Sequence, residues 1–174
     1  MPVRFRNTLL PLLATLAGCH TTLATAAVFT LNDRARPTLT IRIGGGGNSV
    51  STVTFSVPVT SIGNGSPIAG SRNIKIRLDI RAPASAPLTG YLSVDSSVPL
   101  SNGAGGSIPL TSISWTSSDG SIPSGSFNGT SNQLLASFPS SARITDTHTF
   151  TFANNAVYDP GTYNGQITYT WSAP

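Results

Sequence analysis

The chain has no glutamate and one lysine, and charged residues make up only 9% of its 174 residues. A surface helix usually takes its polar face from Glu, Lys and Arg, so this composition disfavours a helical protein. Ser, Thr, Gly and Asn fill the polar positions instead, and these residues suit strands and turns. The net charge of +4 is not gathered into a basic stretch interleaved with aromatics, so no nucleic-acid partner is expected.

Cysteine, histidine and acidic residues are also scarce. The one cysteine, Cys19, lies near the N-terminus, so the rest of the chain has no disulfide. The six acidic residues are all aspartates, and most lie beside Gly, Ser, Asn or Pro, where Asp caps turns. No serine lies in a Gly-x-Ser-x-Gly elbow, and the preferred ligands of zinc are too few. We therefore expect no enzyme, no catalytic residue, no metal site and no cofactor.

Two residues have side chains that could serve either in the core or in a functional site. His148 alternates with Phe150 and Phe152, so we interpret it as packed or at the rim of the core rather than as a base or ligand. Trp115 alternates with Ile113, which favours a core anchor over a ligand platform.

The first 26 residues have the organisation of an export signal. Arg4 and Arg6 precede a mostly apolar run from Thr8 to Gly18, and Ala24 and Ala26 supply the small residues that a signal peptidase inspects. The apolar run is shorter than the roughly 20 residues needed to span a bilayer. We therefore expect an exported protein, cut after Ala26.

A second cleavage stays open. Leu16-Ala17-Gly18-Cys19 resembles a bacterial lipoprotein box, in which the cysteine becomes the lipidated N-terminus. Lipidation of Cys19 would make the protein an outer-membrane lipoprotein.

Past the leader the chain alternates between short strand-like runs and turns. The clearest run is Asn73–Arg81, which has four aliphatic residues on one face and charged residues on the other. No apolar period of 3.6 residues is sustained, so long helices are not expected. Short strands at this spacing predict an all-β protein, an immunoglobulin-like β-sandwich. The expected strands are Val28–Asn32, Thr38–Ile43, Val50–Val57, Asn73–Arg81, Gly90–Asp95, Ser112–Thr116, Gln133–Phe138, Thr147–Phe152 and Thr162–Trp171.

The last of these strands begins PGTYNGQITYTW, and it resembles the final strand of subunits of bacterial chaperone-usher pili, in the alternative or the archaic, spore-coat-U-like class. Gly161 is the fourteenth residue from the C-terminus (174 − 161 + 1 = 14), where that strand begins in such subunits. Gly161, Tyr163 and Gly165 match the Gly-x-Tyr-x-Gly opening. Two features depart from the family: Ala173 replaces a common penultimate tyrosine, and the disulfide of many members is missing.

The resemblance implies a sandwich that lacks one strand and is completed by a donor strand. A periplasmic chaperone would fill the groove first, and after passage through an outer-membrane usher the N-terminal extension of the next subunit would replace it. The groove and C-terminal strand would contribute Gly161, Tyr163, Ile167, Tyr169 and Trp171. The candidate donor residues in the segment 27–43 are Phe29, Leu31, Leu39, Ile41 and Ile43.

Residues 44–49, which include four consecutive glycines, would then link the donor segment to a β-sandwich domain over residues 50–174. The same alternation in Thr38–Ile43 would equally serve a first strand of the chain's own sheet, so both interpretations stay open. We expect a structural subunit of a surface pilus or fimbria, found in the periplasm and then at the cell surface. The alternative is a secreted or lipid-anchored surface binding module or adhesin, and the sequence identifies no host ligand and no shaft or tip position.

Overall fold

The computed structural model describes residues 37–44 and 52–174. These residues form antiparallel strands joined by loops, and their helical elements are two 3-10 turns, Val59–Ser61 (η1) and Leu110–Ser112 (η2). The predicted all-β class is thereby confirmed. Within these ranges no helix has the length and apolar character needed to span a membrane. The predicted leader with Cys19, the candidate donor residues Phe29 and Leu31, and residues 45–49 of the predicted linker lie outside the described residues.

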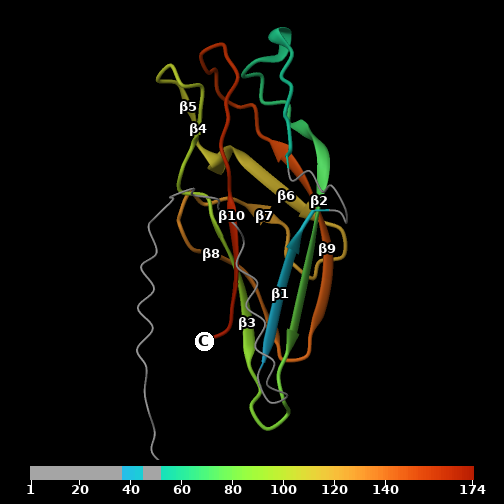
Figure 1. Cartoon of the computed structure of the whole chain (residues 1–174). Coiled ribbons are helices and arrows are strands. Elements are labelled where there is room, and N and C mark those ends of the chain that lie inside the picture. The colour runs from blue at the N-terminus through green and yellow to red at the C-terminus, as the bar shows by residue number, and fades with distance from the viewer. Residues whose placement is uncertain (1–36, 45–51) are drawn as a thin grey trace, which may run out of the picture.

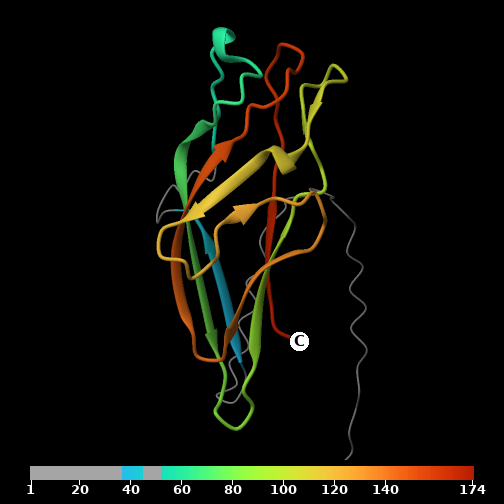
Figure 2. The same cartoon turned by 180° about the vertical axis from the view of Figure 1, so that it is seen from behind.

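Two sheets make up most of the molecule (Figures 1 and 2). The five-stranded sheet has the order β1-β2-β9-β6-β7, and the three-stranded sheet has the order β10-β3-β8. A short hairpin, β4 (Leu100–Ser101) with β5 (Ser107–Ile108), stands apart from both. The bounds of the other strands are β1 Thr38–Ile43, β2 Ile68–Arg81, β3 Thr89–Asp95, β6 Ile113–Ser117, β7 Gly125–Ser126, β8 Gln133–Pro139, β9 Arg143–Phe152 and β10 Thr168–Ser172.

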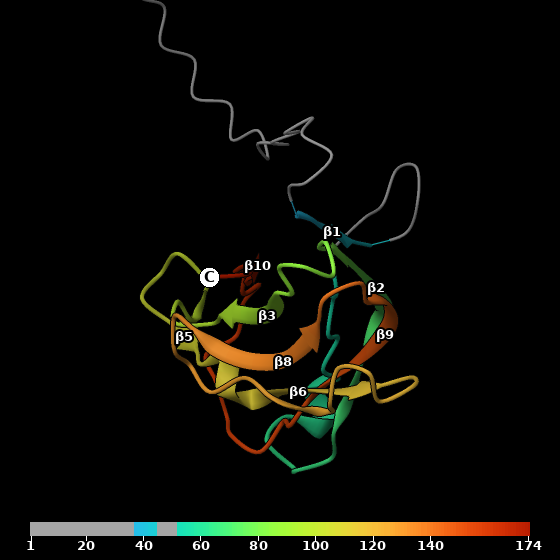
Figure 3. The same cartoon turned by 90° about the horizontal axis from the view of Figure 1, so that it is seen from below.

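The core lies between the two sheets, because each strand turns alternate side chains inward. In β2 the side chains of Ile74, Ile76, Leu78 and Ile80 are buried, while the charged residues between them point outward. Leu92 and Val94 of β3 supply the facing layer. Seen along the strands (Figure 3), the two sheets lie as facing layers, with β1 and β10 at the same end of both.

One predicted strand, Val50–Val57, is wrong in its described part. Residues 52–57 form no strand, although Val53, Phe55 and Val57 are half-buried and pack on the core. The segment meets β2 where the register of β2 shifts between Ala69 and Asn73, and the Ser71 amide donates to the Thr54 carbonyl oxygen at 2.9 Å. The Thr54 amide donates in return to the Ser71 hydroxyl oxygen at 3.0 Å and not to a carbonyl. One backbone hydrogen bond at a bulge is too little for a ladder, so these residues alternate in burial without forming a strand.

The predicted C-terminal strand, Thr162–Trp171, is shorter in the structure, where β10 begins at Thr168. Its partner β3 ends at Asp95, whose carboxylate accepts hydrogen bonds from the Ser97 amide at 2.9 Å and hydroxyl at 2.7 Å. That turn carries the chain away from β10. Residues before Thr168 therefore lack a strand partner there, and Asn164 forms an isolated bridge with Ser101 instead.

Candidate functional site

Strands β1 and β10 meet at one side of the molecule, and we call this meeting the β1–β10 seam. β1 is the edge strand of the five-stranded sheet and β10 is the edge strand of the three-stranded sheet. The two strands contact each other, yet no ladder of hydrogen bonds joins them. In Figure 1 they run in opposite directions, β1 upward and β10 downward. The two sheets are therefore not joined by backbone pairing at this seam.

On the five-stranded side of the seam, β1 contributes three aliphatic residues. Leu39, Ile41 and Ile43 lie opposite Ile80, Leu78 and Ile76 in the antiparallel register with β2. The β1 residues are half-buried, whereas Ile76 and Leu78 are 0% and 1% exposed. Strand β1 therefore covers the edge of the core while being less buried than its neighbour.

On the other side of the seam, Trp171 of β10 joins the two sheets. It lies opposite Leu92 of β3, and its indole packs so closely over Gly90 that a Cβ atom built there would clash with the ring. Phe138 of β8 meets the indole edge-on at a centroid distance of 6.1 Å. The indole Nε1 donates to the carbonyl oxygen of Asp79 on β2 at 3.4 Å. Gly90 is therefore required by the close approach of Trp171.

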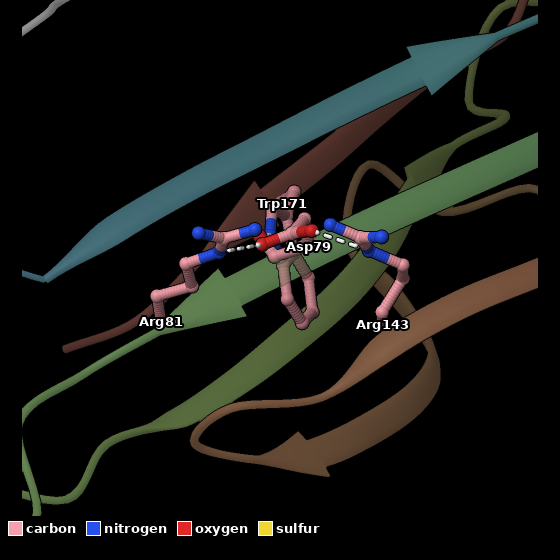
Figure 4. Close-up of polar contacts among 4 residues, drawn as sticks. All are labelled: Asp79, Arg81, Arg143 and Trp171. Atoms are coloured by element: carbon pink, nitrogen blue, oxygen red, sulfur yellow. Dashed lines mark hydrogen bonds and ion pairs between the residues drawn. The ribbon is translucent and has the colours of Figure 1, made fainter.

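The carboxylate of Asp79 holds two arginines, one on each side of it (Figure 4). Arg81 of β2 lies 3.2 Å from one carboxylate oxygen, and Arg143 of β9 lies 2.9 Å from the other. The hydrogen bond from Arg143 is the main reason that the pKa of Asp79 is lowered. Both arginine side chains are largely exposed, so these pairs orient the outer surface more than they stabilise the fold.

The remaining predicted groove residues do not share one strand. Ile167 and Tyr169 are half-buried against the core, and burial raises the pKa of the Tyr169 hydroxyl. Tyr163 instead packs near Tyr158 at a centroid distance of 6.5 Å and donates to the Asp159 carbonyl oxygen at 2.8 Å.

Gly161 and Gly165 lie with Tyr163 beside the β4–β5 hairpin, away from Ile167 and Tyr169. Gly161 lies near Asn102, and a Cβ atom at Gly165 would come within 2.6 Å of Leu100. The Gly-x-Tyr-x-Gly segment therefore packs against the hairpin, and only the residues after it reach the seam.

Sequence reasoning missed that Asp146 is a buried polar residue. It points into the core from β9, and its carboxylate accepts hydrogen bonds from the Ser117 hydroxyl, from the Ser118 amide and hydroxyl, and from the Ile122 and Thr147 amides, at 2.6–3.2 Å. Burial alone would raise its pKa, but these donors outweigh burial and lower the pKa to about 2. The signal was available in the alternation of Ile144, Asp146 and His148 on one face.

His148 and Trp115 are confirmed as core residues. His148 is fully buried and stacks on Trp115 at a centroid distance of 5.8 Å. Neither ring nitrogen has a hydrogen-bond partner among the described residues, and burial lowers the pKa of the imidazole. Trp115 is 4% exposed and donates from Nε1 to the Pro123 carbonyl oxygen at 2.9 Å.

Within residues 37–44 and 52–174, no three His, Cys, Asp or Glu side chains are placed to hold a metal ion. Asp146 and His148, the two buried titratable residues of the described part, are both 0% exposed and therefore out of reach of a substrate. The arrangement that carries a functional argument is the seam.

Comparison of the chain with protein-family models, with curated proteins and with solved structures found no match.

Proposed function

We propose that the chain is a structural subunit of a surface pilus, assembled by exchange of its N-terminal strand between neighbouring subunits. The observation that carries this proposal is the position of β1, which lies at the edge of β2 beside the last strand and is bonded through a ladder on one side only. In this proposal the fold is an immunoglobulin-like sandwich without a closing strand of its own. Strand β1 occupies that place within one chain and occupies the same place in a neighbour after assembly.

Exchange is energetically feasible because the contacts it breaks are those it forms. The ladder with β2 and the contacts of Leu39, Ile41 and Ile43 would be identical whether β1 comes from the same chain or from a second copy. Gly44 ends the strand and opens a run of four glycines in the sequence, a composition typical of flexible linkers. Because each copy would give a strand to one neighbour and receive one from another, the contact is head-to-tail and generates a polymer.

The partners in this proposal follow from the surface that the chain would expose if β1 were absent from the β1–β10 seam. Without β1, the edge of β2 would present unpaired backbone groups beside the aliphatic side chains of Ile76, Leu78 and Ile80. Such an edge promotes aggregation, so the proposal includes a periplasmic chaperone that covers it and an outer-membrane usher where exchange takes place. No further ligand is needed for this function.

The decisive experiment compares substitutions at two residues that lie opposite each other on the paired strands β1 and β2. Ile41 of β1 and Leu78 of β2 are direct register partners, which makes them a matched pair. Leu39→Asp with Ile41→Asp should abolish polymers on sizing, and a synthetic peptide of residues 27–44 should restore the circular dichroism and melting of the parent. Leu78→Asp should stay unfolded with or without peptide, because a buried unpaired charge costs several kcal/mol against a total of about 5–15 kcal/mol.

The control is the same peptide carrying both aspartates, which should neither bind nor restore. A charged β1 variant that unfolds and is not restored by the parent peptide would make β1 a fixed strand of its own sheet. If the parent also remains monomeric, the alternative of a surface binding module takes over. Mass spectrometry of the mature N-terminus adds an independent check, since an acylated Cys19 contradicts a simple pilus subunit.

A further inference from the structure

The basic residues of the described part are confined to one sheet. They are Arg42, Arg72, Lys75, Arg77, Arg81 and Arg143, and they lie on strands β1, β2 and β9. Within residues 37–44 and 52–174, the three-stranded sheet β10-β3-β8 carries none. Except for Arg72, which lies at the register shift of β2, they alternate with inward-facing residues and so point away from the core. We call this surface the outer face.

Three of these residues form a compact group that we call the cationic cluster: Arg42, Lys75 and Arg77. Arg42 lies directly opposite Arg77 in the register of β1 with β2. Lys75 is two residues from Arg77 on the same face, about 6.6 Å along the strand at the usual rise of about 3.3 Å per residue. Among the described residues none of the three forms an ion pair, because Asp79, the one carboxylate of the outer face, is taken by Arg81 and Arg143.

The Arg42–Arg77 pair does not stabilise the sheet. Like charges directly opposite each other on neighbouring strands destabilise a sheet, whereas the threonines elsewhere on this face are good strand residues. In contrast, two guanidinium groups at this spacing form a good receptor for negatively charged oxygens, which they bind by paired hydrogen bonds.

The surroundings of the cationic cluster narrow the chemistry of its partner. Across β9 and β6 the outer face continues with hydroxyl side chains: Thr145, Thr147, Thr149, Thr151, Ser114 and Thr116. Of the large exposed apolar residues in the described part, none lies on β1, β2, β6 or β9. A nucleic acid is disfavoured because the face offers no aromatic ring for stacking bases, and a membrane is disfavoured because the face has nothing apolar to insert.

We propose that the outer face binds a linear acidic polysaccharide, with carboxylate or sulfate groups held by Arg42, Arg77 and Lys75. The hydroxyl side chains of β9 and β6 would hydrogen-bond the sugar hydroxyls beside these charges. The inference does not rest on strand exchange, because Arg42 lies opposite Arg77 whichever copy supplies β1. If the chain does polymerise, the face repeats along the polymer and many weak sites act together.

The test measures binding of the purified full chain by titration calorimetry, starting from an ionic strength of about 0.1–0.15 M. The probes are oligogalacturonate as a polyuronate, heparin oligosaccharide as a sulfated glycan, dextran as a neutral glycan and single-stranded DNA as a second polyanion. Both acidic glycans should bind, with affinity that falls as salt rises, and dextran should not. Arg42→Gln with Arg77→Gln should weaken binding about tenfold or more, since hydrogen bonds between charged groups are lost.

The matched control is Ser137→Glu with Thr170→Glu, which changes the net charge by the same two units on exposed positions of the other sheet. Its affinity should stay within about twofold of the parent, because charges beyond a Debye length of about 8–10 Å are screened. Circular dichroism should show that both double variants are folded, and Lys75→Gln provides a second, single-site loss of affinity. The proposal is overturned if the parent binds neither acidic glycan, if the control weakens binding as much as the cluster variant, or if DNA binds more tightly than either glycan.

Discussion

The two tryptophans of the chain occupy contrasting places. Trp115 is 4% exposed on β6, an inner strand of the five-stranded sheet, with Phe127 at a centroid distance of 5.0 Å and His148 at 5.8 Å. Its indole hydrogen bond, to Pro123, is 2.9 Å long. Trp171 is half-buried on an edge strand, and its indole hydrogen bond, to Asp79, is 3.4 Å long. The first tryptophan is enclosed by strands that pair with each other, whereas the second spans two sheets that do not.

This difference indicates which region of the described chain opens at the lower free energy. Around Trp115, strands β6 and β9 share a ladder, and the buried carboxylate of Asp146 holds the loop that follows β6. Opening that region would break many contacts at once. At the seam, a single ladder and half-buried side chains hold β1 in place. Edge elements of this kind open at lower free energy than the centre of a sheet.

The largest effect that sharpens this comparison is expected from Trp115→Ala. Removing a buried aromatic side chain should lower the free energy of unfolding by roughly 3–5 kcal/mol. Denaturant unfolding followed by circular dichroism measures the loss. A variant as stable as the parent that fails to bind a ligand would instead assign Trp115 to a binding platform.

A smaller effect is expected at the seam from Gly90→Ala. The added methyl group meets the Trp171 ring, and such overpacking should cost about 1–3 kcal/mol. Trp171→Phe removes the distal part of the indole, so the double variant should lose less stability than the two single variants together. Strict additivity would mean that the two residues do not touch.

The smallest effect is the pH dependence of stability that comes from His148, which stacks on Trp115. Because burial lowers the pKa of His148, the unfolded chain binds a proton first as pH falls below the ordinary value of 6.5. The free energy of unfolding should therefore be constant above about pH 6.5. As the pH is lowered below 6.5, it should decrease by at most about 1.4 kcal/mol per pH unit. Thermal melts of the chain without its predicted leader, which carries His20, measure this slope.

His148→Leu is the control, and its stability should not change between pH 7 and pH 5. Both proteins should then lose stability as pH falls from 3.8 towards about 2, where Asp146 is protonated in the folded state. A slope above pH 5 that survives in His148→Leu would assign the titration to another group.

Local patterns in the sequence were sufficient for the class of fold and for much of its core. The alternation in Asn73–Arg81 predicts which side chains of β2 are buried, and β1 has the predicted bounds Thr38–Ile43. The same patterns overestimated the strands at Val50–Val57 and Thr162–Trp171. Alternation reports that side chains face two environments, but it does not report whether a neighbouring strand is present to complete a ladder.

The sequence by itself determined an all-β chain with one apolar and one polar face to each strand, because side-chain period is a local property of the backbone. The tertiary structure decided which distant residues meet. The placement of Arg42 opposite Arg77, of Trp171 over Gly90, and of the Ser117–Ile122 loop on Asp146 depends on strand register and sheet order. Those follow from how the whole core packs, since a shift of one residue in register would turn every inward side chain outward.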